Sequence, residues 1–429
     1  MRNNKFLKSL LAGALAITML AGATVPVSAE PIDPADIDEL VITKNLNTTP
    51  GTTLPSEADR TFTFQMRYHS AMIGDTVLTN NSITGLGTGA WTPSTETGAS
   101  FWRDVATVVV PAGTGSGTVS TADLLAGVTW PTAGEFTFYI REVVTTNPIV
   151  TELPNGNIET LTFDETVYRV TVQVTRNTTT GDLEVTGMAI WVATGPNADL
   201  TEAGKVGEVE FNNRFLREIP STYCPTTDPN YPDCEEPGYN SAGLFVSKTV
   251  TGDGGDTEQL FDFIGTITHA SDDPDLIDQT RTYRAWVYEP DEDNVMVRTG
   301  TYHIFGTTTA EPFQLRHGQE LRFERLPVGT QFVFTETNAH AHTPSVIVTA
   351  NGVASPAVSG TAAAGVTTGP DAYRTGETAA NSAAFTNNRT VAPITGLLAD
   401  NLPLILVGLA GVGLIGLLAV SRRRRAYDV

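Results

Sequence analysis

Apolar and polar residues alternate through most of the chain between residues 30 and 390. In the segment from Tyr168 to Thr175, for example, an apolar side chain is followed by a polar one throughout. Side chains two positions apart lie on the same face of a strand, so this pattern predicts strands with one buried face. Turn sequences such as Thr180-Gly181-Asp182 separate the runs. Many short strands joined by turns predict an all-β fold built from β-sandwiches.

The strand pattern is interrupted by a segment rich in Pro, Asp, Asn and Tyr over residues 220–243. Such a composition is typical of a linker, so we expect tandem sandwich domains over residues 30–219 and 244–390. Both cysteines, Cys224 and Cys234, lie in this linker. In an exported chain two nearby cysteines predict a disulfide, which here would stiffen the joint; a reactive thiol is the alternative.

Residues 1–29 have the three parts of a secretory signal peptide. The start is basic, an apolar stretch follows from Leu10 to Leu20, and Val27-Ser28-Ala29 is a small-residue cleavage site. A membrane anchor is the alternative, but the apolar stretch is short and ends in a cleavable sequence. We therefore expect an exported chain that begins at Glu30 after processing.

The C-terminal end also has three parts in a fixed order. The pentapeptide Ala392-Pro393-Ile394-Thr395-Gly396, within residues 391–396, is followed by residues 397–429. These contain an uncharged stretch from Leu402 to Val420 and then the basic run Arg422–Arg425. An uncharged stretch of this length is about enough to cross a bilayer as a helix, and the arginines would remain cytoplasmic. Taken alone, the pattern predicts a stop-transfer helix, and a permanent single-pass anchor is one interpretation.

The composition argues against several classes of function. The formal net charge is −22, so nucleic acid and anionic lipid would both repel the chain. The sequence has no nucleophile elbow, zinc-protease, P-loop or Rossmann motif, so we expect neither an enzyme nor a cofactor. His340 and His342 are spaced to share a strand face, but a lone His pair is a weak metal signal. The acidic segments 253–258, 272–278 and 289–293 lack the calcium-loop pattern, so no metal site is predicted.

Six polar residues are predicted to point into the cores. Each half opens with a strand that holds one lysine, has a later aromatic strand that carries a glutamate, and closes with a Phe-x-Asn sequence. In every case the polar side chain is in phase with the apolar residues of its strand. The six residues are Lys44, Glu142 and Asn213 in the first half, and Lys248, Glu336 and Asn387 in the second. Asn212 and Asn388 are the neighbouring alternatives, which the strand phase disfavours.

A buried lysine or glutamate without compensation costs several kcal/mol, so two matching sets of residues require an explanation. A buried, hydrogen-bonded ion pair at each site is one. The other is covalent: an apolar pocket favours a neutral amine and a protonated carboxyl group. The amine would then be a nucleophile, and the glutamic acid would polarise the asparagine and relay protons as ammonia leaves. The product would be a Lys–Asn isopeptide bond between the first and last strands of a domain.

These residues resemble the streptococcal-type pilin domains that form internal isopeptide bonds. The segments Phe313–Gln319 and Leu326-Pro327-Val328-Gly329 are similar to that family's sequence ahead of the glutamate strand. The resemblance implies two tandem Ig-like or CnaB-like β-sandwich domains, with bonds Lys44–Asn213 and Lys248–Asn387 formed with the help of Glu142 and Glu336. The C-terminal pentapeptide is similar to an LPxTG-type sorting signal, with Ala392 in place of the usual leucine. By that resemblance, a sortase cleaves between Thr395 and Gly396 and joins Thr395 to an amine.

The number of lysines favours a backbone subunit. The chain has five, and Lys5 and Lys8 belong to the signal peptide. If Lys44 and Lys248 form internal bonds, Lys205 is the remaining side-chain amine. It lies eight residues before Asn213, and in the resembling pilins the acceptor lysine also shortly precedes the bond-forming asparagine. An ordinary solvated lysine is the alternative.

The sequence therefore predicts a subunit of a Gram-positive pilus that is located at the cell wall. The expected partners are a sortase, other copies of the chain, peptidoglycan, and minor pilins or a host surface ligand. A monomeric wall-anchored adhesin or a pilus-tip adhesin is the alternative function, since a terminal adhesin needs no acceptor amine.

Overall fold

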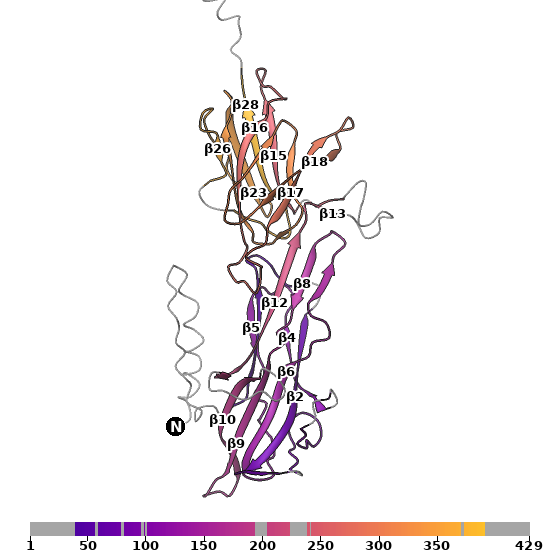
Figure 1. The fold of residues 1–429 in the computed structure, drawn as a ribbon, viewed down its shortest axis with the longest axis vertical. Coiled ribbons are helices and arrows are strands. Elements are labelled where there is room, and N and C mark those ends of the chain that lie inside the picture. Colours follow the sequence, from indigo (N-terminus) through magenta and orange to yellow (C-terminus); the bar gives the residue numbers. More distant parts are fainter. Residues whose placement is uncertain are drawn as a thin grey trace, which may run out of the picture.

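The computed structural model describes residues 39–55, 59–78, 81–95, 98, 101–193, 204–223, 238–240, 242–369 and 373–390. In these ranges the regular elements are β-strands, arranged in two domains along the long axis of the molecule (Figure 1). The all-β prediction and the two-domain prediction are confirmed. The signal peptide, Cys224, Cys234 and residues 391–429 lie outside the described ranges. Within those ranges, no helix is long and apolar enough to cross a membrane.

The first domain consists of two facing sheets. Sheet 1 has the order β5-β1-β12-β8-β7, with bounds Gly117–Ser120, Ile42–Thr48, Val209–Ile219, Ile158–Thr162 and Ile149–Glu152. Sheet 2 has the order β11-β10-β9-β6-β2-β3, with bounds Lys205–Val206, Leu183–Ala193, Val167–Arg176, Gly134–Glu142, Arg60–Ile73 and Thr76–Val77. Strand β4 (Arg103–Val110) pairs with β2 in sheet 2.

The second domain repeats this two-sheet plan. Sheet 3 has the order β18-β17-β20-β15-β28-β23-β24, with bounds Met296–Phe305, Tyr283–Pro290, Glu320–Phe323, Leu244–Thr251, Asn381–Asn388, Thr343–Ala350 and Val353–Ala354. Strand β25 (Val358–Ser359) pairs with β23 in the same sheet. Sheet 4 has the order β19-β16-β22-β26, with bounds Glu311–Leu315, Phe261–Thr268, Gln331–Asn338 and Val366–Thr367, and β27 (Tyr373–Arg374) pairs with β22.

In each domain the first strand pairs in parallel with the last. Strand β1 lies beside β12, and β15 lies beside β28. Alternate residues of these strands are buried, as in the pattern of β15, because one face of each sheet packs on the core. The cores are rich in aromatic side chains, with Phe64, Phe136 and Phe211 fully buried in the first domain. This arrangement places the two ends of each domain side by side in one sheet.

The two domains are joined by direct contacts as well as by the chain. Strand β12 continues past the first domain, where Ile219 pairs with Leu326 in β21 (Leu326–Pro327). Arg217 bonds both Glu159 of the first domain and Glu377 of the second. The short strands β13 (Thr222–Tyr223) and β14 (Gly238–Tyr239) pair where the linker leaves and returns. The joint therefore has contacts that do not depend on the cysteines.

Candidate functional site

The first candidate site joins three polar side chains inside the first domain. Lys44 and Asn213 are diagonal neighbours on the parallel strands β1 and β12, where Lys44 pairs with Phe211 and Leu46 with Asn213. Glu142 ends strand β6 in the facing sheet. Its Oε2 atom lies 2.8 Å from Lys44 Nζ, and its Oε1 accepts a hydrogen bond of 2.9 Å from Asn213 Nδ2. The glutamate therefore connects the two sheets by contacting both residues with separate oxygens.

The second site has the same three residue types in the same places. Lys248 lies in β15, Asn387 in β28, and Glu336 in β22 of the facing sheet. Glu336 Oε1 lies 2.8 Å from Lys248 Nζ and also accepts a hydrogen bond of 2.6 Å from Asn387 Nδ2. One carboxylate oxygen of Glu336 thus contacts both the lysine and the asparagine, whereas Glu142 uses a different oxygen for each.

All six side chains are buried, as the strand phase predicts. None of the six residues is more than 4% exposed. A phenylalanine ring packs against each amine. Lys44 Nζ lies 4.9 Å from the centroid of the Phe62 ring, and Lys248 Nζ lies 4.1 Å from that of the Phe261 ring. Each site is therefore an apolar pocket that holds one amine, one carboxyl group and one carboxamide.

Burial shifts the pKa of both lysines and of Glu142 in the direction that favours their neutral forms. Loss of hydration lowers the pKa of Lys44 and of Lys248 to about 8, although the adjacent glutamates act in the opposite direction. Burial also raises the pKa of Glu142, again against the effect of its lysine. A pKa of about 8 leaves roughly a tenth of the amines uncharged at pH 7. Both pockets thus favour a nucleophilic amine, and the first pocket also favours a proton-donating carboxyl group.

The neighbouring asparagines are placed elsewhere. The side chain of Asn212 accepts a hydrogen bond of 3.0 Å from Asn45 Nδ2 outside the core, and Asn388 is exposed. The strand phase thus distinguishes the core asparagine from its neighbour in both domains. Lys205 belongs to neither triad, because it lies in β11 at the edge of sheet 2 and is partly exposed.

Sequence reasoning missed one residue of the first site. The backbone N–H of Asp164 donates a hydrogen bond of 2.8 Å to Asn213 Oδ1. Asp164 lies in the loop between β8 and β9, where strand phase gives no information about direction. The sequence Asp164-Glu165-Thr166 is typical of a turn, and it contains no signal that predicts a contact with Asn213.

The prediction that His340 and His342 share a strand face is wrong. Strand β22 ends at Asn338, and both histidines lie in the turn before β23. His340 and Ala341 have positive φ angles of 47° and 67°, which no extended strand contains. In the described ranges, no three His, Cys, Asp or Glu side chains are grouped as metal ligands.

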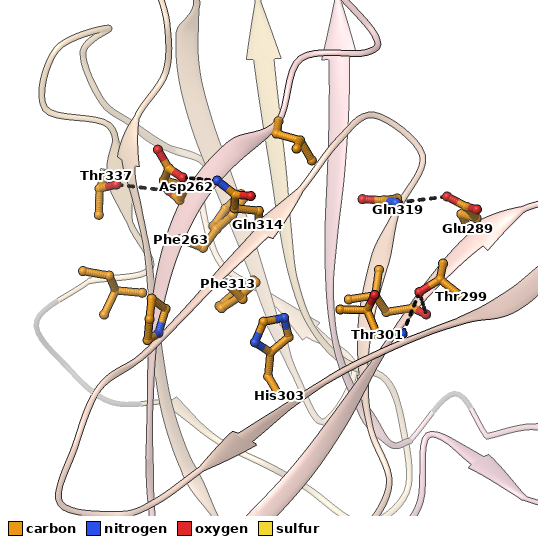
Figure 2. A pocket seen from close by; sticks show the side chains of 14 residues that line it. Asp262, Phe263, Glu289, Thr299, Thr301, His303, Phe313, Gln314, Gln319 and Thr337 are labelled. Atoms are coloured by element: carbon orange, nitrogen blue, oxygen red, sulfur yellow. Dashed lines mark hydrogen bonds between the residues drawn. The ribbon is translucent and has the colours of Figure 1, made fainter.

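A separate groove lies at the open edge of the second domain. It is formed where sheets 3 and 4 end in β18 and β19, and its volume is about 750 Å³. Figure 2 shows Phe263 and Phe313 inside it, His303 on one side and Asp262 with Gln314 on the other. Gln314 donates a hydrogen bond of 2.7 Å to Asp262. No residue of the two triads lines this groove.

Comparison with known proteins gives a family model for each domain. Residues 40–215 match the Spy0128-like isopeptide containing domain, and residues 242–389 match a domain of unknown function (DUF7601). No curated protein matches the chain. The first match contains Lys44, Glu142 and Asn213, and the second contains Lys248, Glu336 and Asn387.

Among solved structures, the chain is similar to the major pilin from Streptococcus pyogenes. The identity is 19%, with 84% of this chain and 100% of that chain covered at a TM-score of 0.29. It is also similar to the pilus-presented adhesin Spy0125 (Cpa), at 10% identity, 82% and 100% coverage and a TM-score of 0.24.

Proposed function

We propose that this chain is the backbone subunit of a sortase-assembled pilus, in which each domain is locked by an internal Lys–Asn isopeptide bond. The observation that carries the proposal is the pair of buried triads, each with an amine and a carboxamide in contact with one glutamate. The match of residues 40–215 to an isopeptide-containing domain family supports the same chemistry in the first domain. A non-enzymatic, structural role at the cell surface follows.

The proposed reaction needs no cofactor. In the first domain the uncharged amine of Lys44 attacks Cγ of Asn213, and the Cγ–Nδ2 bond breaks. Glu142 takes a proton from the attacking nitrogen at Oε2 and supplies one to Nδ2 from Oε1, so ammonia leaves. The two contacts of 2.8 and 2.9 Å are within the range for proton transfer. In the second domain Lys248 is the nucleophile and Asn387 the acceptor, and Glu336 contacts both of them through Oε1.

The assembly step rests on the sequence. A sortase cleaves the motif Ala392–Gly396 after Thr395, and the resulting acyl group passes to an amine. Lys205 is the proposed acceptor in a second copy of the chain, because the other two lysines of the mature chain are used internally. Attachment to peptidoglycan ends the polymer. The cysteines Cys224 and Cys234 form the proposed disulfide of the linker.

Intact-mass measurement of the exported chain tests the internal bonds. The wild-type protein is expected to be lighter than its sequence by two molecules of ammonia. Glu142→Ala and Glu336→Ala should each restore one of the two losses, because each removes the proton relay of one site only. A wild-type mass equal to that of the sequence would leave buried ion pairs as the explanation of both sites.

An adhesin, anchored singly or at the pilus tip, is the second candidate function. The groove between β18 and β19 favours it, because a pocket of about 750 Å³ with an aromatic floor and polar walls suits a ligand. Denaturing gels of cell-wall extracts separate the two functions. A ladder of covalent multimers supports the backbone role, and a single band supports the adhesin.

A further inference from the structure

The two triads differ in what contacts the carbonyl oxygen of the asparagine. In the first site, the Asp164 N–H donates to Asn213 Oδ1 at 2.8 Å. The Asp164 carboxylate fixes this loop to β12, since it accepts hydrogen bonds from the backbone N–H groups of Asn212 at 2.8 Å and Thr166 at 2.9 Å. Two hydrogen bonds therefore join the loop to β12, and the third, from Thr166, lies within the loop and fixes its turn.

The second site has no equivalent donor within the part of the chain that the structure describes. Asn387 Oδ1 is buried there without a hydrogen-bond partner, and so is Glu336 Oε2. A buried carbonyl oxygen without a donor is costly, and so is a buried carboxylate oxygen. In the described residues, the contact between Glu336 and the carboxamide of Asn387 is made at its nitrogen, Nδ2, and not at its carbonyl oxygen.

We infer that the Asp164 backbone N–H is the oxyanion-stabilising group of the first site, and that the Asp164 carboxylate positions it. The inference rests on the proposed isopeptide chemistry. When the Lys44 nitrogen bonds to Cγ, the π pair of the carboxamide moves to Oδ1, which already accepts the Asp164 hydrogen bond. As Oδ1 returns to a carbonyl, the Cγ–Nδ2 bond breaks and ammonia leaves with the proton from Glu142.

The two sites therefore differ chemically, because the first has a separate N–H donor to the asparagine carbonyl oxygen and the second, among the described residues, does not. Glu142 contacts Lys44 and Asn213 through different oxygens and only has to move protons, because a separate donor polarises the carbonyl group. In the second site, Glu336 contacts the amine of Lys248 and the Nδ2 atom of Asn387 through the same oxygen, and no described N–H contacts the carbonyl oxygen of Asn387. Removing a single preorganised oxyanion donor costs enzymes about 10²- to 10³-fold in rate.

The test compares the two ammonia losses within one molecule as they appear over time after cell-free synthesis of the chain. Asp164→Pro deletes the N–H. It should slow the ammonia loss of the first domain on the order of 10²-fold relative to that of the second domain. Asp164→Ala keeps the N–H but releases the loop, so a smaller slowing is expected. Asp164→Asn retains an acceptor oxygen and should remain close to wild type.

The second-domain loss is the internal control, because Asp164 contacts no residue of that site. A first loss at the wild-type rate in a folded Asp164→Pro chain would overturn the inference, as would equal rates in the Ala and Asn variants. If Asp164→Pro fails to fold, as judged by circular dichroism, the Ala and Asn pair decides. Absence of both losses from the wild-type chain would instead contradict the proposed function.

A second, independent feature is a row of residues that crosses the outer face of sheet 2 and ends at Lys205. Successive strands pair Arg67 with Tyr139, Tyr139 with Arg169, Arg169 with Trp191, and Trp191 with Lys205. Residues that are directly opposite one another share a face of the sheet. All five therefore line one face, and this row contains cationic and aromatic residues without a carboxylate.

Part of the row is covered by the chain itself, and the part next to Lys205 is partly exposed. Arg67 is buried, with its guanidinium 4.7 Å from the Tyr139 ring and 5.6 Å from that of Trp102. Arg169, Trp191 and Lys205 remain partly exposed. Trp and Arg are the residue types that contribute most to protein interfaces. A cationic and aromatic surface thus adjoins the proposed acceptor amine.

The distal end of the second domain has the opposite charge. Strand β28 ends there, and Arg389 O accepts a hydrogen bond of 3.0 Å from Gly254 in the loop after β15. The loops after β15 and β17 carry the acidic residues Asp253, Asp256, Glu258, Asp291, Glu292 and Asp293, of which Glu258 is paired with Arg316. Ala392, the first residue of the sorting motif, follows Arg389 by three positions. The acidic loops therefore lie where the chain leaves toward its sorting motif.

We propose that Arg169 and Trp191 dock the acidic distal end of a second copy of this chain, which brings its Thr395 to Lys205. This proposal rests on the proposed polymerisation. A second copy of this chain is the partner that fits this surface. Its acidic loops complement the positive charge of the row, and they lie at the same end of the second domain as the last residues before its sorting motif. Five extended residues after Thr390 reach at most about 18 Å, so docking near Lys205 restricts where the acyl group can be delivered.

Sortase reactions with the purified exported chain, with its sorting motif intact, test the docking surface. The whole chain and a short peptide with the Ala392–Gly396 sequence serve as alternative donors to Lys205. Arg169→Glu should reduce transfer from the whole chain about tenfold more than transfer from the peptide, and Trp191→Ala should act in the same direction. Arg176→Glu, the same charge change away from the row, is the matched control.

Charge reversal in the donor provides the complementary arm. A donor with Asp291→Arg and Glu292→Arg should restore transfer to the Arg169→Glu acceptor, because the two surfaces again differ in sign. If Arg169→Glu reduced transfer from the whole chain and from the peptide equally, the row would contact the sortase rather than a second copy, and the proposal would be overturned. Unchanged transfer from the whole chain would overturn it as well. Transfer that persists in Lys205→Arg would contradict the acceptor assignment instead.

Discussion

At the scale of single residues, the buried amines make stability depend on pH in a defined direction. Burial lowers the pKa of Lys44 to about 8, against 10.5 for an unperturbed lysine. Between these values the unfolded chain holds more protons than the folded one, so the free energy of unfolding increases with pH. This applies to a chain in which the amine is free, because an isopeptide nitrogen does not titrate.

Asn213→Ala is the variant that exposes this effect. It prevents the proposed bond and leaves Lys44 beside Glu142, so its first domain should become more stable between pH 8 and 10. The slope should be at most about 1.4 kcal/mol per pH unit. Urea unfolding at several pH values measures it, with Lys44→Met/Asn213→Ala as the control without the amine. Identical slopes in the two variants would mean that Lys44 is charged in the folded chain.

Residue-scale features were predictable only where strand geometry fixes a direction. A side chain in a regular strand has two possible faces, so the apolar neighbours of Lys44 and Glu336 were sufficient to predict their burial. Asp164 lies in a loop, where the direction of the N–H depends on a turn and on the position of β12. His340 and His342 were misplaced for a related reason, since spacing indicates a face only while the strand continues.

At the scale of elements, the proposed bonds connect the first and last strands of each domain. Lys248 and Asn387 lie on the parallel strands β15 and β28, so a bond between them closes nearly the whole second domain into a loop. By analogy with a disulfide, closing a loop of about 100 residues restricts the unfolded chain by about 4.7 kcal/mol. The isopeptide hypothesis already required the first and last strands to be close, but alternation of apolar residues could not predict that they pair directly and in parallel.

Two adjacent asparagines provide a matched test of this closure. Asn387→Ala should abolish the ammonia loss of the second domain and lower its free energy of unfolding by up to about 5 kcal/mol. Asn388→Ala alters the exposed neighbour on the same strand and should leave both properties unchanged. Differential scanning calorimetry measures stability, and intact mass measures the bond. Equal stability of the two variants would show that the covalent link contributes little to the fold.

At the scale of the whole molecule, the two domains and their joint form a continuous rod-like unit (Figure 1). Strand β12 carries Asn213 and then pairs with β21 of the second domain, so one strand links the first proposed bond to the joint. Arg217, on the same strand, bonds Glu377 across the joint. If the proposed bonds form, tension along a pilus would pass from one domain to the next through these strand and ion-pair contacts.

The proposed acceptor, Lys205, provides the test of whether such units are joined end to end. Lys205→Arg keeps the positive charge but removes the nucleophile, because arginine remains protonated at physiological pH. The variant should fold, retain both ammonia losses and reach the cell wall as a monomer, since Lys205 contacts neither triad. Gels of wall extracts should lose their ladder, and mass spectrometry of wild-type pili should find Thr395 joined to Lys205. Ladders that persist in Lys205→Arg cells would place the acceptor at another amine, with Lys44 the next candidate.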